Sequence, residues 1–88
     1  MISIDDIRKR VGKKEYEISL HAEKERYAED ITISDIESAI DTGDVLEYYP
    51  GDPRGESCLV LGYPRNRPIH IVCGYTQLAR FYRVRWND

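Results

Sequence analysis

The first half of the chain shows helical and strand-like hydrophobic patterns in turn. Ser3 can cap a helix over residues 4–12, because apolar residues recur there at helical spacing. Residues 16–21 alternate strictly between apolar and polar side chains, which predicts a first strand with His21 facing away from the core. Residues 21–29 are rich in helix formers and lack breakers, so a short second helix is predicted there.

A third helix is predicted after residue 31 and ends at Gly43. Its cap is either Thr32, with Asp35 at the third helical position, or Ser34, with Glu37 in that role. The pattern of apolar residues fits both starting points. The sequence therefore predicts the helix and leaves its first residue open.

Beyond Gly43 the helical period gives way to short apolar strands. They are predicted at residues 45–49, 57–63, 68–75 and 79–86. Residues 50–55 contain too many breakers to be anything but a loop, and residues 64–67 close a hairpin. We expect one α+β domain over residues 1–88, with N-terminal helices packed on one face of a mostly antiparallel, four- to five-stranded sheet.

The hairpin fixes which side chains share a face. Symmetric closure pairs Leu61 with His70 and Cys58 with Cys73. One face then carries only small or β-branched apolar residues and should lie under the helices: Cys58, Val60, Gly62, Ile69, Ile71 and Cys73. The other face would hold Ser57 and His70 together with His21. A shift of one residue would reverse the two faces.

Charge divides unevenly along the 88 residues, whose net charge is −3. Residues 1–44 carry seven bases against twelve acids, and residues 45–88 carry six bases, all arginine, against four acids. Arginine suits a phosphate-binding patch, because its guanidinium is a rigid fork of donors. Its stem can equally cover apolar sheet surface. The overall acidity argues against strong non-specific binding to nucleic acid.

The cysteine content and the N-terminal residues bear on the cellular compartment. The chain has two cysteines, no apolar leader and no apolar stretch of about 18 residues. These features predict a reduced, cytoplasmic protein that does not span a membrane. Cys58 and Cys73 are interpreted as buried thiols rather than as a disulfide or zinc ligands. We therefore predict neither a metal site nor a cofactor.

The candidate chemistry rests on histidine and arginine. His21 and His70 can act as general acid and base near neutral pH, although a half-buried histidine bonded to a backbone carbonyl fits equally. Four arginines are candidates to stabilise the charge of a phosphodiester, although each also fits a solvated surface position: Arg26, Arg65, Arg67 and Arg83.

Several motifs follow one another in a fixed order between residues 16 and 75. They include His21-Ala22-x-x-x-Arg26, Ile31-Thr32-x-x-Asp35-Ile36-Glu37, Glu47-x-Tyr49-Pro50, Asp52-Pro53-Arg54-Gly55-x-Ser57-Cys58 and Arg67-Pro68-Ile69-His70. Together they resemble a prokaryotic domain-of-unknown-function family, number 4258. That family is similar in fold to the RelE/ParE superfamily of small toxins.

The resemblance implies a compact, toxin-like α+β fold. By analogy with RelE-like relatives, it implies ribosome-dependent cleavage of messenger RNA, with RNA or the ribosome and an antitoxin-like small protein as partners. It also places His21, Arg26, Ser57 and His70 at recurrent polar positions of the family. Many members carry arginine where this chain has Glu25 and Glu29.

Two functional hypotheses follow. The first is an RNA-directed endonuclease that needs no metal. Its proposed catalytic residues are His21, His70 and Arg26, and its proposed substrate-binding residues are Arg65, Arg67, Arg83 and Ser57. The second is a non-catalytic module that docks a partner protein, which the acidic net charge favours. The oligomeric state is not predicted.

Overall fold

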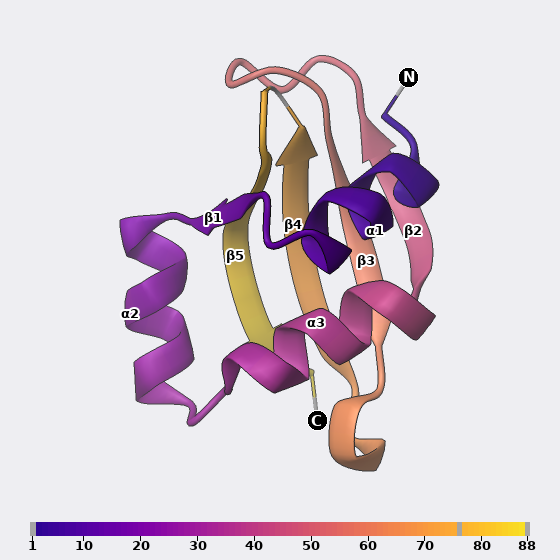
Figure 1. The fold of residues 1–88 in the computed structure, drawn as a ribbon. Coiled ribbons are helices and arrows are strands. Elements are labelled where there is room, and N and C mark those ends of the chain that lie inside the picture. The colour runs from indigo at the N-terminus through magenta and orange to yellow at the C-terminus, as the bar shows by residue number, and fades with distance from the viewer. Residues whose placement is uncertain (1, 76, 88) are drawn as a thin grey trace.

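A computed structural model describes residues 2–75 and 77–87. The helices are α1 (Ile4–Gly12), α2 (Leu20–Ala28) and α3 (Ile33–Thr42), with a short 3-10 turn η1 (Pro64–Asn66). The strands are β1 (Tyr16–Ile18), β2 (Asp44–Tyr49), β3 (Ser57–Gly62), β4 (Ile69–Tyr75) and β5 (Ala79–Trp86). They form one sheet in the order β1-β5-β4-β3-β2, and α1 and α3 lie across one of its faces (Figure 1).

The α+β class is confirmed, but the sheet is mixed rather than mostly antiparallel. Strand β1 runs parallel to β5, whereas the pairs β5–β4, β4–β3 and β3–β2 are antiparallel. No tight turn joins β1 to β5, because residues 19–78 lie between them. Their relative direction is set by tertiary packing, which an alternating sequence pattern does not record.

The helix caps settle the alternatives left by the sequence. Ser3 caps α1 by accepting a hydrogen bond from the backbone N–H of Asp6. Thr32, not Ser34, caps α3: its hydroxyl accepts from the Asp35 N–H at 3.0 Å, and the Asp35 carboxylate accepts from the Thr32 N–H at 2.9 Å. This reciprocal pair satisfies two backbone donors that the first helical turn leaves without partners.

The predicted first strand is too long, because β1 ends at Ile18 and α2 begins at Leu20. Ser19 makes the transition: its N–H donates to the carbonyl of Phe81 in β5, and its hydroxyl caps α2 by accepting from the Ala22 N–H. His21 is therefore helical and does not belong to the sheet. The cap and the helix formers that follow it outweigh the alternating pattern.

The predicted hairpin register is confirmed, with Cys58 opposite Cys73 and Leu61 opposite His70. The face under the helices is buried along β3 and β4, and both thiols are free. Helix α3 packs so closely on this face that a Cβ at Gly62 would lie 2.7 Å from the Cα of Ala39. Glycine is therefore required at residue 62 for the helix to reach the sheet.

Helix α2 lies along the edge of β5 that the short strand β1 does not cover (Figure 1). The Glu25 carboxylate accepts the Val84 N–H at 3.2 Å, and the indole N–H of Trp86 donates to the Glu29 carbonyl at 2.8 Å. The first contact pairs a backbone N–H that the open edge of β5 would otherwise leave without a partner, and the second ties the C-terminal end of α2 to Trp86. Within the described ranges, no helix has both the length and the apolar character needed to cross a lipid bilayer.

Candidate functional site

The sheet face opposite α1 and α3 carries a row of arginines on β5. Arg80, Arg83 and Arg85 lie opposite Gly74, Val72 and His70 of β4. Alternation alone would place residues 80 and 83 on opposite faces. A bulge between them, where Tyr82 is the extra residue, brings both guanidinium groups to the outer face.

Arg80 and Arg83 border a shallow pocket of about 410 Å³. Its lining comes from the start of α2, the β2–β3 loop and β5, and consists of Ser19, His21, Arg54, Arg80, Tyr82 and Arg83. These six side chains are cationic, aromatic or hydroxyl-bearing, and none of the carboxylates that the structure describes is among them. Such a set of donors suits an anion.

Tyr82 forms the floor of this outer-face pocket and is almost completely buried. Its ring lies on Gly74, where a Cβ would approach the ring to 2.4 Å. The guanidinium carbon of Arg54 lies 3.7 Å from the centre of the same ring, so the ring is held between a glycine and an arginine. The glycine at residue 74 is thus explained by the close approach of the tyrosine.

Asp52 holds Arg54 in this position. Its carboxylate accepts from the backbone N–H of Arg54 at 3.0 Å and from Nε and Nη2 of the same residue at 3.0 and 2.8 Å. It also accepts from the Ser57 hydroxyl at 2.7 Å. These hydrogen bonds, led by those from Arg54, hold the pKa of Asp52 far below its ordinary value. Ser57 is buried, so it supports the site from behind and does not line the pocket.

The other two pocket arginines are held more loosely. Nε of Arg80 lies 3.2 Å from Glu17, and Nη2 of Arg83 lies 3.2 Å from Glu25. Glu25 also lies 3.6 Å from Nε2 of His21. A guanidinium has five N–H donors, so a single carboxylate contact leaves most of them available to a ligand.

The two predicted catalytic histidines are placed differently. His21 lines the pocket beside Arg83. His70 lies on the outer face opposite Arg85, with its Nε2 3.4 Å from the amide nitrogen of Asn87, and it does not line the pocket. The structure therefore brings His21 of α2 together with Arg83 of β5 and leaves His70 of β4 outside the pocket, on the outer face of the sheet.

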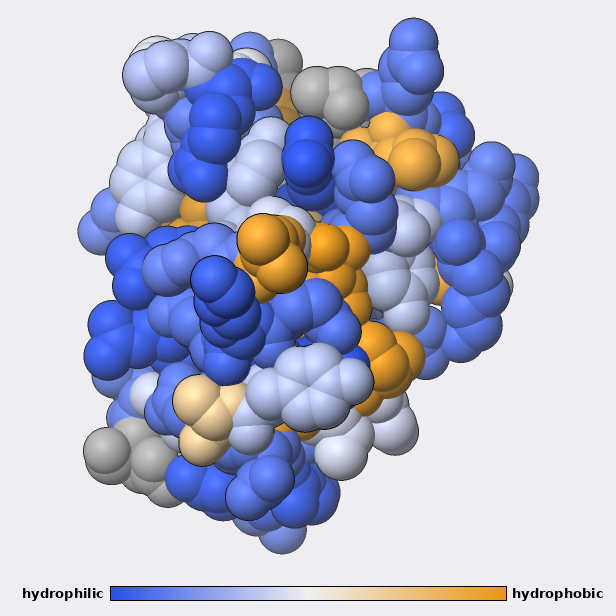
Figure 2. Space-filling model, turned by 90° about the vertical axis from the view of Figure 1, so that its left-hand side faces the viewer, coloured by the Kyte–Doolittle hydropathy of each residue, from blue (hydrophilic) through white to orange (hydrophobic). Residues whose placement is uncertain are grey.

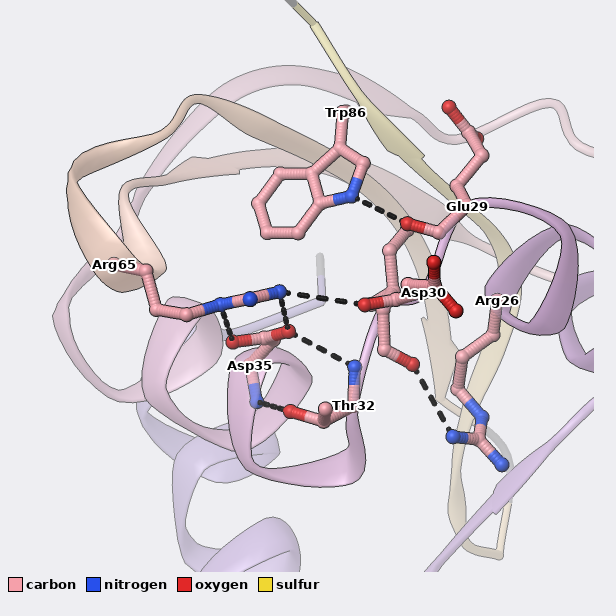
Figure 3. Close-up of polar contacts among 8 residues, drawn as sticks. Arg26, Glu29, Asp30, Thr32, Asp35, Arg65 and Trp86 are labelled. Atoms are coloured by element: carbon pink, nitrogen blue, oxygen red, sulfur yellow. Dashed lines mark hydrogen bonds and ion pairs between the residues drawn. The ribbon is translucent and has the colours of Figure 1, made fainter.

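Arg65 and Arg67 lie at the hairpin end of the molecule, around Trp86. Arg65 forms a bidentate ion pair with the buried carboxylate of Asp35, at 3.0 and 2.7 Å, and donates to the carbonyl of Asp30 (Figure 3). The guanidinium carbon of Arg67 lies 4.0 Å from the indole centre. Because Asp35 also caps α3, this network joins the hairpin to that helix.

Arg26 lies at the C-terminal end of α2 and is also held in place. It forms a bidentate ion pair with Glu23, both contacts at 2.9 Å, and donates to the carbonyl of Ile31 (Figure 3 shows the latter bond). Its guanidinium also packs on the Tyr27 ring. These contacts fix the link between α2 and α3, away from the outer-face pocket.

Sequence reasoning did not select Arg54, Arg80 or Tyr82. Arg54 stood in a loop rich in breakers, and Arg80 and Tyr82 stood in an apparently regular strand. The combination Asp52-x-Arg54-x-x-Ser57 carried a signal, because an aspartate can accept from a backbone N–H two residues further on. The bulge that unites Arg80 with Arg83 has no comparable signature.

The comparisons with known proteins identify a family and no closer relative. The family model described as a domain of unknown function (DUF4258) matches residues 18–82. Neither the curated proteins nor the solved structures yield a significant match. The matched segment contains α2, the first half of β5 and every residue that lines the outer-face pocket except Arg83, which directly follows it. The chain therefore belongs to the DUF4258 family.

Proposed function

We propose that this protein is a toxin-like, RNA-directed endonuclease of a toxin–antitoxin-type system in prokaryotes. The observation that carries the proposal is the convergence of His21, Arg80 and Arg83 on one pocket of the uncovered sheet face. The resemblance to RelE/ParE-like toxins supports the same reading at the level of the fold. The partners that belong to this proposal are RNA or the ribosome, and an antitoxin-like small protein.

The chemistry uses the 2′-hydroxyl of the RNA as nucleophile. Its oxygen bonds to phosphorus while the bond to the 5′ oxygen breaks, which leaves a 2′,3′-cyclic phosphate and a 5′-hydroxyl. His21 is the proposed base that takes the 2′ proton, and Arg80 and Arg83 stabilise the charge that develops on the phosphorane. His70, on the same outer face, is the proposed source of the proton for the leaving oxygen.

The test is cleavage of a defined messenger RNA with and without ribosomes, in the presence of a chelator. The proposal predicts cleavage by the wild type, 2′,3′-cyclic phosphate ends, and a loss of about 100-fold or more in H21A. R85K is the matched control, because Arg85 lies on β5 outside the pocket and the substitution preserves the positive charge. Intact RNA in both settings, together with normal growth on expression, would refute the proposal.

A non-catalytic protein-binding role is the second candidate, and an exposed apolar face of α2 favours it. Leu20 and Tyr27 lie two turns apart on one side of this helix and are 73% and 74% exposed. Figure 2, viewed from the α2 side, shows hydrophobic atoms among a largely polar surface. If this face rather than the outer-face pocket carries the function, L20S abolishes association with the native partner and H21A does not.

A further inference from the structure

Arg54 differs from the other arginines of the outer-face pocket in how far a carboxylate compensates its charge. Asp52 contacts its backbone N–H, Nε and Nη2, whereas Arg80 and Arg83 each meet a carboxylate through one nitrogen. The carboxylate of Asp52 is itself nearly buried, with 8% of its side chain exposed. The charge of Arg54 is therefore largely compensated, which makes it a poor ligand for phosphate.

The orientation of the Arg54 guanidinium plane is also fixed. The guanidinium carbon lies 3.7 Å from the centre of the Tyr82 ring, a separation that two flat groups reach when they stack. Tyr82 cannot yield, because its ring rests on Gly74. About half of the Arg54 side chain, 49%, remains exposed, so a second flat group can reach it from solvent.

We propose that Arg54 is a stacking platform for one unpaired base of an RNA strand, an inference that rests on the function proposed above. Guanidinium planes and aromatic rings are the surfaces on which proteins stack unpaired bases. The base would extend the existing stack of Gly74, Tyr82 and Arg54 into solvent, while Arg80 and Arg83 hold the adjoining phosphate in the same pocket.

If Arg54 stacks on a base while Arg80 and Arg83 bind the adjoining phosphate, the substrate is single-stranded RNA. In a duplex both faces of an internal base are covered by its neighbours, so a protein platform has no free face to contact. Stacking is tolerant of base identity, because every base has a flat apolar face. Arg54 therefore selects for an unpaired nucleotide rather than for a particular sequence.

Two substitutions separate stacking from electrostatics. R54K keeps the charge and loses the plane, whereas R54Q loses the charge and keeps a flat terminal amide. A stacking platform predicts that R54K binds a six-nucleotide single-stranded RNA at least about fivefold more weakly than the wild type, and that R54Q is affected less. A purely electrostatic role predicts the opposite order.

Three probes are titrated into the protein and followed by NMR: the six-nucleotide single-stranded RNA, its duplex and ribose 5-phosphate. Ribose 5-phosphate has no base, so its affinity should be the same in R54K and the wild type. R85K should leave all three affinities unchanged. If R54K binds the single strand as well as the wild type does, the platform is refuted while the RNA-directed function stands. If the wild type binds none of the three probes, the proposed function fails as well.

Discussion

At the scale of single residues, the outer-face pocket depends on a glycine, Gly74, which has no side chain to contact a ligand. Gly74 lets the Tyr82 ring lie flat on β4, and Tyr82 in turn supports the guanidinium of Arg54. Asp52 and Ser57 fix the same arginine from the loop side. The stack therefore has a supporting contact at each end, and removing either should release Arg54.

Gly74→Ala should release it from the strand side. The added Cβ would lie 2.4 Å from Tyr82 Cε2, so the ring must move off the sheet. We expect a loss of about 1–3 kcal/mol in the free energy of unfolding, measured in urea, together with weaker binding of single-stranded RNA. Gly12→Ala is the control, because nothing lies within 4 Å of its Cβ position. Wild-type stability in Gly74→Ala would show that the ring is not held there.

Asp52→Asn should release Arg54 from the loop side, with a defined dependence on pH. Hydrogen bonds from Arg54 lower the pKa of Asp52 in the folded state. The carboxylate thus adds stability above its unfolded pKa of about 3.9, and this stability is lost as pH falls through the folded value. Urea unfolding should show wild type and D52N diverging at neutral pH and converging in strong acid. A constant difference across that range would contradict the assignment.

At the scale of elements, polar side chains connect parts of the fold that the backbone does not. Glu25 of α2 bonds the open edge of β5, and Arg65 of the hairpin bonds the capping aspartate of α3. Glu25 supplies the partner that a neighbouring strand would have supplied, and the Arg65–Asp35 ion pair joins the hairpin to α3. Arg65 can reach Asp35 because it adopts a positive φ of 53° in the hairpin turn.

Arg65→Ala tests whether this arginine supports the fold or contacts substrate. Its removal leaves the buried Asp35 carboxylate without its ion-pair partner, although the Thr32 N–H still donates to it. Because Arg65 is itself about half exposed, we expect a modest loss of about 1–2 kcal/mol in the free energy of unfolding. Binding of RNA at the outer-face pocket should be unchanged. Lower RNA affinity at full stability would instead support a substrate-binding role.

At the scale of the whole molecule, the two faces of the sheet have separate tasks. The face under α1 and α3 forms the core, with Cys58 and Cys73 among its fully buried residues. The opposite face carries the arginines and the pocket. Stability and the proposed activity are thus encoded by alternate residues of the same strands, since successive side chains of a strand point to opposite faces.

The core thiols provide a test of this division. Burial raises the pKa of Cys58 to about 11 and raises that of Cys73 as well, so little reactive thiolate forms near neutral pH. Both should resist a water-soluble thiol reagent in the native protein and react rapidly in denaturant. Rapid labelling of either one under native conditions would show that the helical layer opens locally.

Local patterns were sufficient for most of the secondary structure. The cap at Ser3, the glycine that ends α3 and the register of Cys58 with Cys73 all follow from neighbours in the sequence, whereas the choice between Thr32 and Ser34 as the cap of α3 did not. Where the pattern misled, at Leu20 and His21, two local signals competed and the helix cap prevailed. The family resemblance was likewise readable from ordered motifs between residues 16 and 75, and the family model matches residues 18–82.

By itself, then, the sequence determined the elements, the buried face and the family, because helix caps, turns and hydrophobic periodicity act over a few residues. The tertiary structure decided the parallel pairing of β1 with β5, the separation of His70 from the pocket and the union of Arg54, Arg80 and Tyr82. These features depend on contacts between distant segments and on one bulge. No periodic pattern specifies them, because they arise only when the strands and the β2–β3 loop pack together.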